Sequence, residues 1–200
     1  MEAAFAAGAD WLQLRDRELT GSAWLAWARE LSDAAANGAR RRGAEPIVLV
    51  NRRLDIALAL GAAGAHLGFD ALGLDSARSL LGPDSTLGVS AHTPEEVGAA
   101  AAAGADYAHL APIFAPLSKP AERPALGTAA LQVSSRPGFR VLAQGGIEPG
   151  NTAQVIRCGA SGIAVTGTIL QADDPAQATR ALRDALDSAA PALPDALQTR

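Results

Sequence analysis

One short pattern, a helix that ends at a glycine and then runs into a buried strand, occurs four times in this chain. Each copy has an Ala- and Leu-rich stretch, a glycine suited to the left-handed position after a helix, and a short apolar run. Repeated units of this kind indicate β/α units that together form a parallel sheet. The copies are Ala7-Gly8-Ala9-Asp10 before Trp11-Leu12-Gln13-Leu14, Leu60-Gly61-Ala62-Ala63 before Gly64-Ala65-His66-Leu67, Ala103-Gly104-Ala105-Asp106 before Tyr107-Ala108-His109-Leu110, and Cys158-Gly159-Ala160-Ser161 before Gly162-Ile163-Ala164-Val165.

Extending this pattern along the chain predicts seven strands, each followed by a helix, with one further helix ahead of the first strand. A closed β/α barrel requires eight strands. The predicted fold class is therefore α/β, a TIM (β/α)8 barrel whose first strand is missing from this chain. We expect residues 1–188 to form this single domain and residues 189–200 to form a C-terminal tail. The predicted strands are 11–15, 46–51, 64–67, 86–90, 106–111, 139–143 and 162–166, and the predicted helices are 2–8, 21–42, 53–60, 74–81, 94–103, 127–133, 150–158 and 174–188.

The composition excludes several classes of protein. A chain of 200 residues suits one domain with a sizeable core. Its net charge of −4 and its single short basic run, Arg40-Arg41-Arg42, argue against nucleic acid as a partner. No apolar run would span a bilayer, the N-terminus resembles no signal peptide, and the single cysteine, Cys158, fits a reducing compartment. We therefore expect a cytoplasmic protein with no membrane partner, and the sheet edges left by a missing strand would favour a homo-oligomer.

The stretch of residues 141–168 carries the strongest signal for a ligand. Two neighbouring buried strands in it end in glycine-containing turns, Gly145-Gly146 and Thr166-Gly167-Thr168. Glycine lets backbone N–H groups approach an anion closely, and the loops after the last two strands of a β/α barrel commonly bind phosphate. The alternative is two ordinary strand–helix turns. We favour a phosphate site.

Polar and cationic side chains follow most of the other predicted strands. Because parallel strands place their carboxyl ends on one face of a barrel, these side chains should converge there and attract an anionic ligand. Lys119 is the most informative of them, since it is the only lysine against 16 arginines, and Ser118 beside it adds a hydroxyl donor. The set comprises Gln13, Arg15, Arg17, Asn51, His66, Ser90, Ser118 and Lys119.

The histidines and the cysteine indicate no nucleophile and no dedicated metal site. His66 and His92 follow strands and would serve equally well as packing or loop-orienting groups. His109 lies inside an apolar strand, which indicates a buried histidine with a hydrogen-bond partner. No pair has metal-ligand spacing on one element, and Cys158 at a helix end is expected to be structural.

The strand-end motifs match one known family when they are taken together and in order. They are Gln13-Leu14-Arg15, Asn51 with Asp55-Ile56-Ala57-Leu58-Ala59-Leu60-Gly61, His66-Leu67-Gly68, Gly88-Val89-Ser90-Ala91-His92-Thr93, Gly104-Ala105-Asp106-Tyr107, Pro112-Ile113-Phe114, Ser118-Lys119-Pro120, Gly145-Gly146-Ile147 and Gly159-Ala160. With these motifs the chain resembles the thiamine-phosphate synthase and TenI family, from Ala7 as far as Leu186.

The resemblance implies a TIM barrel that joins hydroxymethylpyrimidine diphosphate to thiazole phosphate, giving thiamine phosphate and diphosphate. Small phosphorylated heterocycles are thus the expected partners. The departing diphosphate carries charge, so the protein must supply donors and cations and not a base. By resemblance, the catalytic residues are Arg15, Asn51, Ser90 and Lys119, and the substrate-binding residues are Gln13, Arg17, His66, Ser118, Gly145, Gly146, Thr166 and Gly167.

The resemblance also implies Mg²⁺ as a cofactor, although the usual acids are replaced here. Arg52 and Ala71 stand at the usual metal-binding positions, and Asp70 is the remaining candidate ligand. TenI-type members, which isomerise thiazole phosphate, rely on a histidine where this chain has Pro112. Three hypotheses therefore stay open, namely a transferase impaired by loss of the acids, a TenI-type thiazole tautomerase, and a non-catalytic protein that binds thiazole or thiamine phosphate.

Overall fold

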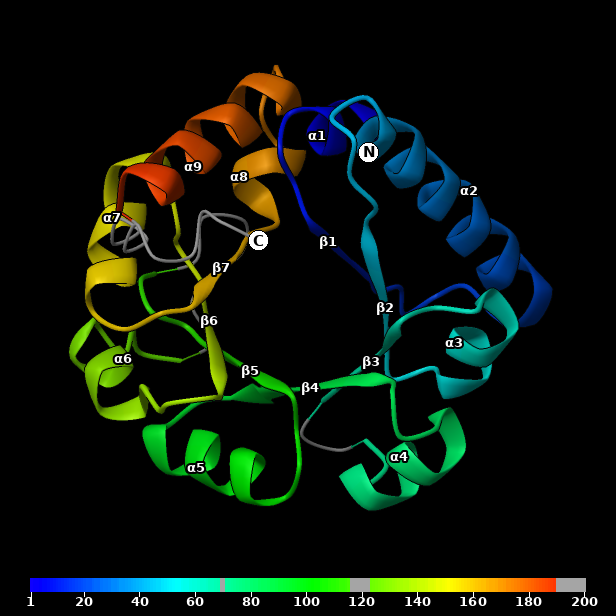
Figure 1. Ribbon diagram of the computed structural model, residues 1–200, viewed down its shortest axis with the longest axis horizontal. Helices are drawn as coiled ribbons and strands as arrows, with labels where there is room; N and C mark the ends of the chain where they lie inside the picture. Colours follow the sequence, from blue (N-terminus) through cyan, green and yellow to red (C-terminus); the bar gives the residue numbers. More distant parts are fainter. Residues whose placement is uncertain (69–70, 116–122, 190–200) are drawn as a thin grey trace, which may run out of the picture.

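A curved sheet of parallel strands forms the centre of the computed structural model, which describes residues 1–68, 71–115 and 123–189. Seven strands follow one another across the sheet in chain order, each parallel to the next. They surround a central space, and the helices form an outer ring (Figure 1). This arrangement confirms the predicted α/β barrel and its seven strands. The strands are β1 (Trp11–Leu14), β2 (Ile47–Asn51), β3 (Gly64–Leu67), β4 (Thr86–Ala91), β5 (Tyr107–Leu110), β6 (Arg140–Gln144) and β7 (Gly162–Ala164).

All of the predicted helices are present, and the described residues contain one more. The addition is α8, whose four residues directly after β7 are too few to give a helical period in the sequence. None of the helices in the described ranges is long and apolar enough to cross a membrane. The helices are α1 (Glu2–Ala6), α2 (Gly21–Arg40), α3 (Leu54–Leu60), α4 (Leu74–Leu81), α5 (Pro94–Ala102), α6 (Ala129–Ser134), α7 (Pro149–Arg157), α8 (Gly167–Leu170) and α9 (Pro175–Ala189). The division between a domain and a tail after residue 188 stays a prediction, and residues 190–200 lie outside the described ranges.

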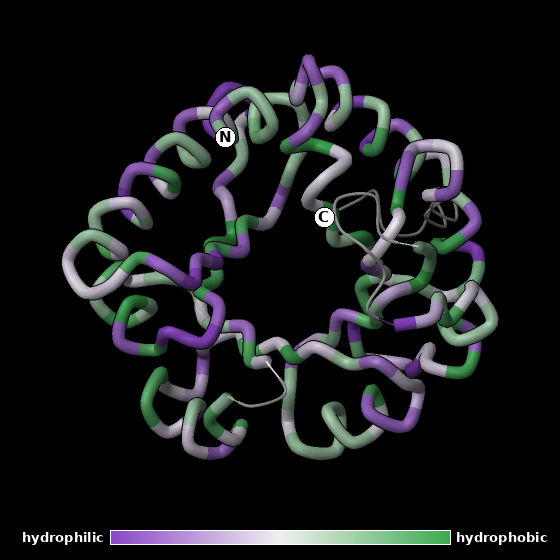
Figure 2. Tube along the Cα trace, turned by 180° about the vertical axis from the view of Figure 1, so that it is seen from behind, coloured by the Kyte–Doolittle hydropathy of each residue, from purple (hydrophilic) through white to green (hydrophobic). Residues whose placement is uncertain are grey.

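Alternation along the strands decides which side chains meet the helices. In β3, Ala65 and Leu67 belong to a hydrophobic cluster with Leu54 of α3 and Ala77 of α4, so they point outward. Successive side chains of a strand point to opposite faces, and His66 therefore points into the barrel. Polar and apolar residues alternate along the helices of the outer ring, as expected for helices with one buried face (Figure 2). The interior of the barrel is thus a second core, separate from the layer between strands and helices.

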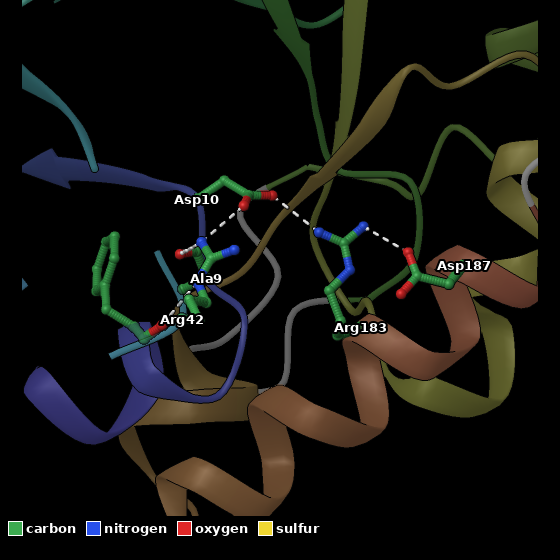
Figure 3. A network of polar contacts seen from close by, with 6 residues as sticks. Ala9, Asp10, Arg42, Arg183 and Asp187 are labelled. Carbon is green, nitrogen blue, oxygen red and sulfur yellow. Dashed lines mark hydrogen bonds and ion pairs between the residues drawn. The ribbon is translucent and has the colours of Figure 1, made fainter. Parts of the chain in front are cut away.

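The sheet is open between β1 and β7, which are not paired with each other in the described part of the chain. Charged side chains tie the outer elements together near this opening (Figure 3). Asp10, just ahead of β1, accepts hydrogen bonds from Arg42 at 2.9 Å and from Arg183 of α9 at 2.8 Å. Arg183 also pairs with Asp187 at 3.1 Å, and Arg42 donates to the carbonyl oxygen of Ala9 at 2.7 Å. These contacts hold the C-terminal end of α2 and the middle of α9 against the start of β1.

The tight interior predicts opposite effects for two glycine substitutions. A Cβ added to Gly88 of β4 would lie 1.9 Å from Cζ of Tyr107, whereas one added to Gly150 of α7 would meet nothing within 4 Å. We expect Gly88→Ala to lower the free energy of unfolding by about 1–3 kcal/mol through overpacking. The control, Gly150→Ala, should raise it by about 0.5–1 kcal/mol through helix propensity. Urea-induced unfolding measures both changes, and a neutral Gly88→Ala would contradict the close packing of the interior.

Candidate functional site

The carboxyl ends of the strands meet at one end of the barrel and carry most of the predicted site residues. Strand register places Asn51 of β2 beside His66 of β3, and Ser90 of β4 beside His109 of β5. Gln13 lies in β1, and exposed Arg15 and Arg17 follow that strand; Gly145 and Gly146 follow β6, while Thr166 and Gly167 follow β7. Asp70, Ser118 and Lys119 lie outside the described residues, so the predictions for these three stay predictions.

The loop that carries Arg15 and Arg17 is shaped by Asp16 between them. The Asp16 carboxylate accepts hydrogen bonds from the backbone N–H groups of Glu18 at 2.8 Å and Leu19 at 2.6 Å. These two bonds hold the pKa of Asp16 below its usual value. The turn thus fixes the backbone from which both guanidinium groups extend.

Below the carboxyl ends of the strands, which form the rim of the barrel, His66 of β3 is hydrogen-bonded at both of its ring nitrogens to side chains of the next two strands, β4 and β5. Its Nδ1 lies 2.9 Å from the phenol oxygen of Tyr107, and its Nε2 lies 2.9 Å from Oγ of Ser90. His66 and Tyr107 are 1% and 0% exposed, so these bonds form away from water. Edge-on contact with the ring of Trp11, at 5.1 Å between centroids, further fixes the Tyr107 ring.

His109 extends the same group of polar side chains toward β6. Its ring lies 4.4 Å from that of His66, centroid to centroid, and it hydrogen-bonds the side chain of Gln144. His109 is buried, which agrees with the prediction of a core histidine that has a partner. Five inward-facing side chains from four successive strands, β3 to β6, therefore form one group inside the barrel, which we term the interior cluster; three of them are buried, and Ser90 and Gln144 are half-buried. Its members are His66, Ser90, Tyr107, His109 and Gln144.

Burial keeps the interior cluster uncharged. Desolvation, with smaller contributions from His109 and the positive charge of Arg15, lowers the pKa of His66 to about 2. Desolvation also lowers the pKa of His109 to about 4, against a smaller opposing effect of the Gln144 hydrogen bond. The pKa of Tyr107 is raised by burial and by the nearby Asp106. At neutral pH the barrel thus has a neutral interior beneath a rim that carries arginines.

His92 has a positioning role in the loops. Its Nδ1 lies 2.7 Å from the carbonyl oxygen of Ala111, directly after β5, and its backbone N–H donates to Glu96 of α5 at 2.6 Å. Thr93 caps α5, since its hydroxyl oxygen accepts a hydrogen bond from the Glu96 N–H at 3.2 Å. His92 therefore orients the loop after β5 through its own hydrogen bonds.

The two glycines after β6 are required by their backbone and by close packing. Gly145 and Gly146 have φ of +93° and +62°, values that side-chain-bearing residues rarely adopt. A Cβ on Gly146 would lie 2.4 Å from the carbonyl oxygen of Ala115. The backbone N–H of Phe114 in turn donates to the carbonyl oxygen of Gly145 at 3.0 Å. The glycines thus hold the loop after β5 tightly against the end of β6.

The turn after β7 lies against the turn after β6. Thr168 donates its hydroxyl hydrogen to the carbonyl oxygen of Ile147 at 2.6 Å. Within the described ranges, no protein acceptor is bonded to the backbone N–H groups of Gly146, Gly167 or Thr168. Such N–H groups on adjacent turns are the donors that a phosphate oxygen requires.

The end of β2 has an unusual backbone at Arg52. Its φ is +63°, in the left-handed region, where Asn, Asp and Gly are favoured over long side chains. Its backbone N–H donates to the carbonyl oxygen of His66 at 2.9 Å, which fixes the turn. Arg52 and Ala71 bring no carboxylate to the two usual metal positions, and the part of the chain that the structure describes contains no group of three His, Cys, Asp or Glu side chains suited to a metal. These two described residues therefore supply no carboxylate for Mg²⁺ at those positions, and Asp70 lies outside the described ranges.

Three residues of the interior cluster were not among the predicted site residues. They are Tyr107, His109 and Gln144, and their signal in the sequence is only that Tyr107 and His109 share one face of a predicted strand and that Gln144 directly follows another. Tyr107 is bonded to a residue 41 positions earlier. A pairing over such a distance requires the strand register, which the local pattern does not provide.

The fold and its polar strand ends define a class of protein, the β/α barrels with a functional site at the carboxyl ends of the strands. A family model for thiamine monophosphate synthase matches residues 1–169. A thiamine-phosphate synthase from Chlorobium phaeovibrioides is 44% identical over 176 residues, covering 88% of this chain and 81% of the relative. One from Roseiflexus castenholzii is 39% identical over 185 residues, covering 92% and 78%. The chain also aligns with 37% of the length of the bifunctional thiamine biosynthesis protein ThiM/ThiE of Symbiobacterium thermophilum, at 40% identity over 185 residues, or 92% of this chain.

Solved structures agree with the sequence relatives. A thiamine phosphate pyrophosphorylase from Pyrococcus furiosus superposes with a TM-score of 0.79 and 26% identity, covering 94% of this chain and 88% of the other. A 3-hexulose-6-phosphate synthase superposes with a TM-score of 0.62 at 21% identity, covering 92% and 93%, which shows a shared fold alone. The chain belongs to the thiamine-phosphate synthase family. Its function is accordingly that of a thiamine-phosphate synthase, a transferase of thiamine biosynthesis, and family membership implies the use of Mg²⁺.

The buried histidines predict a pH dependence of stability. In the unfolded chain a histidine has a pKa near 6.5, whereas the folded pKa values are about 2 for His66 and about 4 for His109. Below pH 6.5 the unfolded chain therefore binds protons that the folded chain does not. The free energy of unfolding should fall between pH 6.5 and pH 5, by up to about 1.4 kcal/mol per pH unit for each histidine.

Urea-induced unfolding at pH 7, 6 and 5 measures this slope. His109→Gln removes one of the two titrating groups and should flatten it, because only His66 then contributes. An unchanged slope in His109→Gln would show that His109 is not held neutral in the folded protein.

Proposed function

We propose that this chain acts in the cytoplasm and joins hydroxymethylpyrimidine diphosphate to thiazole phosphate, forming thiamine phosphate and releasing diphosphate. The proposal rests on one observation above all, the convergence of the family's strand-end residues on one end of the barrel. Asn51, His66 and Ser90 lie there on three neighbouring strands. The exposed Arg15 and Arg17 follow β1 at the same end.

The chemistry requires stabilisation of the departing diphosphate. A diphosphate group offers only acceptors, so it needs cations and hydrogen-bond donors around it. Arg15, Asn51, Ser90 and Lys119 are the proposed catalytic groups, because each supplies a donor or a positive charge. The proposed substrate-binding residues supply the remaining contacts, with Gln13, Arg17 and Ser118 around the first substrate and the phosphate of the second. His66 is buried and has both ring nitrogens bonded to Tyr107 and Ser90, so it would act on the substrate through Ser90. Gly145, Gly146, Thr166 and Gly167 would complete the phosphate site through their turns.

Mg²⁺ is the point at which this chain departs from the family pattern. Since Arg52 and Ala71 supply no carboxylate for the ion, no step of the proposal passes through it. Asp70 is the one candidate ligand that the sequence offers at the usual place. Positive charge from the arginines of the rim and from Lys119 would instead balance the diphosphate.

Lys119→Ala should lower kcat for thiamine phosphate formation roughly a hundredfold, because the protein loses one positive charge that would stabilise the leaving diphosphate. The assay supplies both substrates and measures thiamine phosphate with and without Mg²⁺. Lys119→Arg should keep part of the activity, since it keeps the charge but changes the donor geometry. Arg157→Ala, at the exposed end of α7, is the matched control and should behave as the wild type. Wild-type turnover in Lys119→Ala would remove this residue from the mechanism.

Arg52→Asp should increase the Mg²⁺-dependent rate of thiamine phosphate formation. The substitution adds a carboxylate at the usual metal position, and Asp adopts the positive φ of this position more readily than Arg does. Arg52→Gly is the control, because it relieves the backbone but adds no ligand. Rates measured across a Mg²⁺ titration separate the two variants. Equal Mg²⁺-dependent rates in Arg52→Asp and Arg52→Gly would show that the missing carboxylate does not limit the reaction.

The same assay also tests the two alternatives to the synthase. Thiazole isomerisation without thiamine phosphate, the TenI-type result, would contradict the proposed reaction, and so would binding of thiazole phosphate with neither reaction. A homo-oligomer, expected from the unpaired edges of β1 and β7, stays a prediction.

A further inference from the structure

The two hydrogen-bond partners of His66 indicate which of its ring nitrogens carries the proton. A neutral imidazole has one N–H donor and one acceptor nitrogen, so its two partners must have opposite roles. Tyr107 faces Nδ1 and Ser90 faces Nε2, each at 2.9 Å. Either the phenol donates and Ser90 accepts, or the phenol accepts and Ser90 donates.

The burial of Tyr107 decides between these arrangements. Its phenol is fully buried, and within the described part of the chain the only polar partner of its hydroxyl is Nδ1 of His66. If Nδ1 carried the proton, the Tyr107 O–H would be left without an acceptor, at the cost of its full desolvation. Packing against Gly88 and the edge of Trp11 keeps the phenol from turning elsewhere. The phenol therefore donates to Nδ1, and the proton of His66 resides on Nε2.

This tautomer determines what Ser90 offers to a ligand. Nε2–H donates to Oγ of Ser90, so the hydroxyl hydrogen of Ser90 is not used within the cluster. Ser90 is half-buried and lies near the carboxyl end of β4, where its hydrogen can point toward the rim. In the opposite tautomer the hydroxyl would donate to Nε2 and present only lone pairs to the rim, which a diphosphate oxygen would repel.

We propose that Tyr107 is a positioning residue that fixes the tautomer of His66 and so makes the Ser90 hydroxyl a hydrogen-bond donor to the diphosphate. The identity of the anion rests on the proposed function, whereas the hydrogen-bond order Tyr107 to His66 to Ser90 does not. No bond is made or broken in this chain of donors. It orders three hydrogen atoms before the ligand arrives, which is the kind of preorganisation that favours a charged leaving group.

The first test is the tautomer itself. Nitrogen-15 NMR of the histidine rings in the full chain, with His66 assigned by its loss in His66→Gln, distinguishes a protonated Nε2 from a protonated Nδ1. We expect the Nε2–H form in the wild type. In Tyr107→Phe, which keeps the ring and removes the hydroxyl, the Nδ1–H form should become populated. Trp11→Phe alters packing beside the same phenol without removing a hydrogen bond and should leave the tautomer unchanged. A wild-type Nδ1–H tautomer would overturn the proposal.

The second test is binding of inorganic diphosphate by calorimetry, which requires no turnover. Ser90→Ala should weaken the Kd about tenfold, and Tyr107→Phe should weaken it by a smaller factor because part of the population keeps the productive tautomer. In a Ser90→Ala background the further change Tyr107→Phe should have no effect, since no hydroxyl remains to be oriented. An equal penalty in both backgrounds would mean that Tyr107 acts only through packing and would overturn the proposal. Absence of thiamine phosphate formation, with both tests met, would count against the proposed function alone.

Discussion

The structure depends on the alternation of side chains along seven parallel strands. Each strand sends one set of residues outward to the helices and the other set into the barrel, where water is scarce. Apolar residues such as Leu67 and Val50 face outward and pack in the layer between strands and helices. The second core contains polar groups, and these are stable there only because they are neutral and hydrogen-bonded to one another. A charged or unpaired member of the interior cluster would lower the free energy of unfolding.

Charged side chains at the two ends of the barrel have different roles. At the amino end of β1, Asp10 joins Arg42, just after α2, to Arg183 of α9 beside the open edge. At the carboxyl end, Arg15 and Arg17 are exposed and extend from a turn held by Asp16. One end thus uses opposite charges for cohesion, and the other presents arginines from a fixed turn. This separation explains how a chain with a net charge of −4 can still attract an anion.

The architecture was predictable because its signal is local and repeated. The helix–glycine–strand pattern marks four strands directly, and extending it along the chain predicted the other three. The strand ends predicted which residues would meet at one face. The structure adds what depends on contacts between distant segments. His66 is bonded to residues 41 and 24 positions later, and neither bond follows from the residues around it. The four-residue helix α8 and the left-handed backbone of Arg52 were also not predicted. The helix spans barely one turn, too little for a periodic pattern to show, and the backbone of Arg52 runs against the preference of its residue type.

The central claim is that phosphate groups bind at the carboxyl ends of the strands. A crystal structure of the full chain with inorganic diphosphate and thiazole phosphate tests it most directly. The account predicts phosphate density beside Gly146 and Gly167 and within reach of Ser90. The contrary result would place the anions at the opposite end of the barrel, in the open cleft of about 480 Å³ that is lined by Arg136, Arg140 and Ser161. Anions found there, with the carboxyl ends empty, would contradict the account.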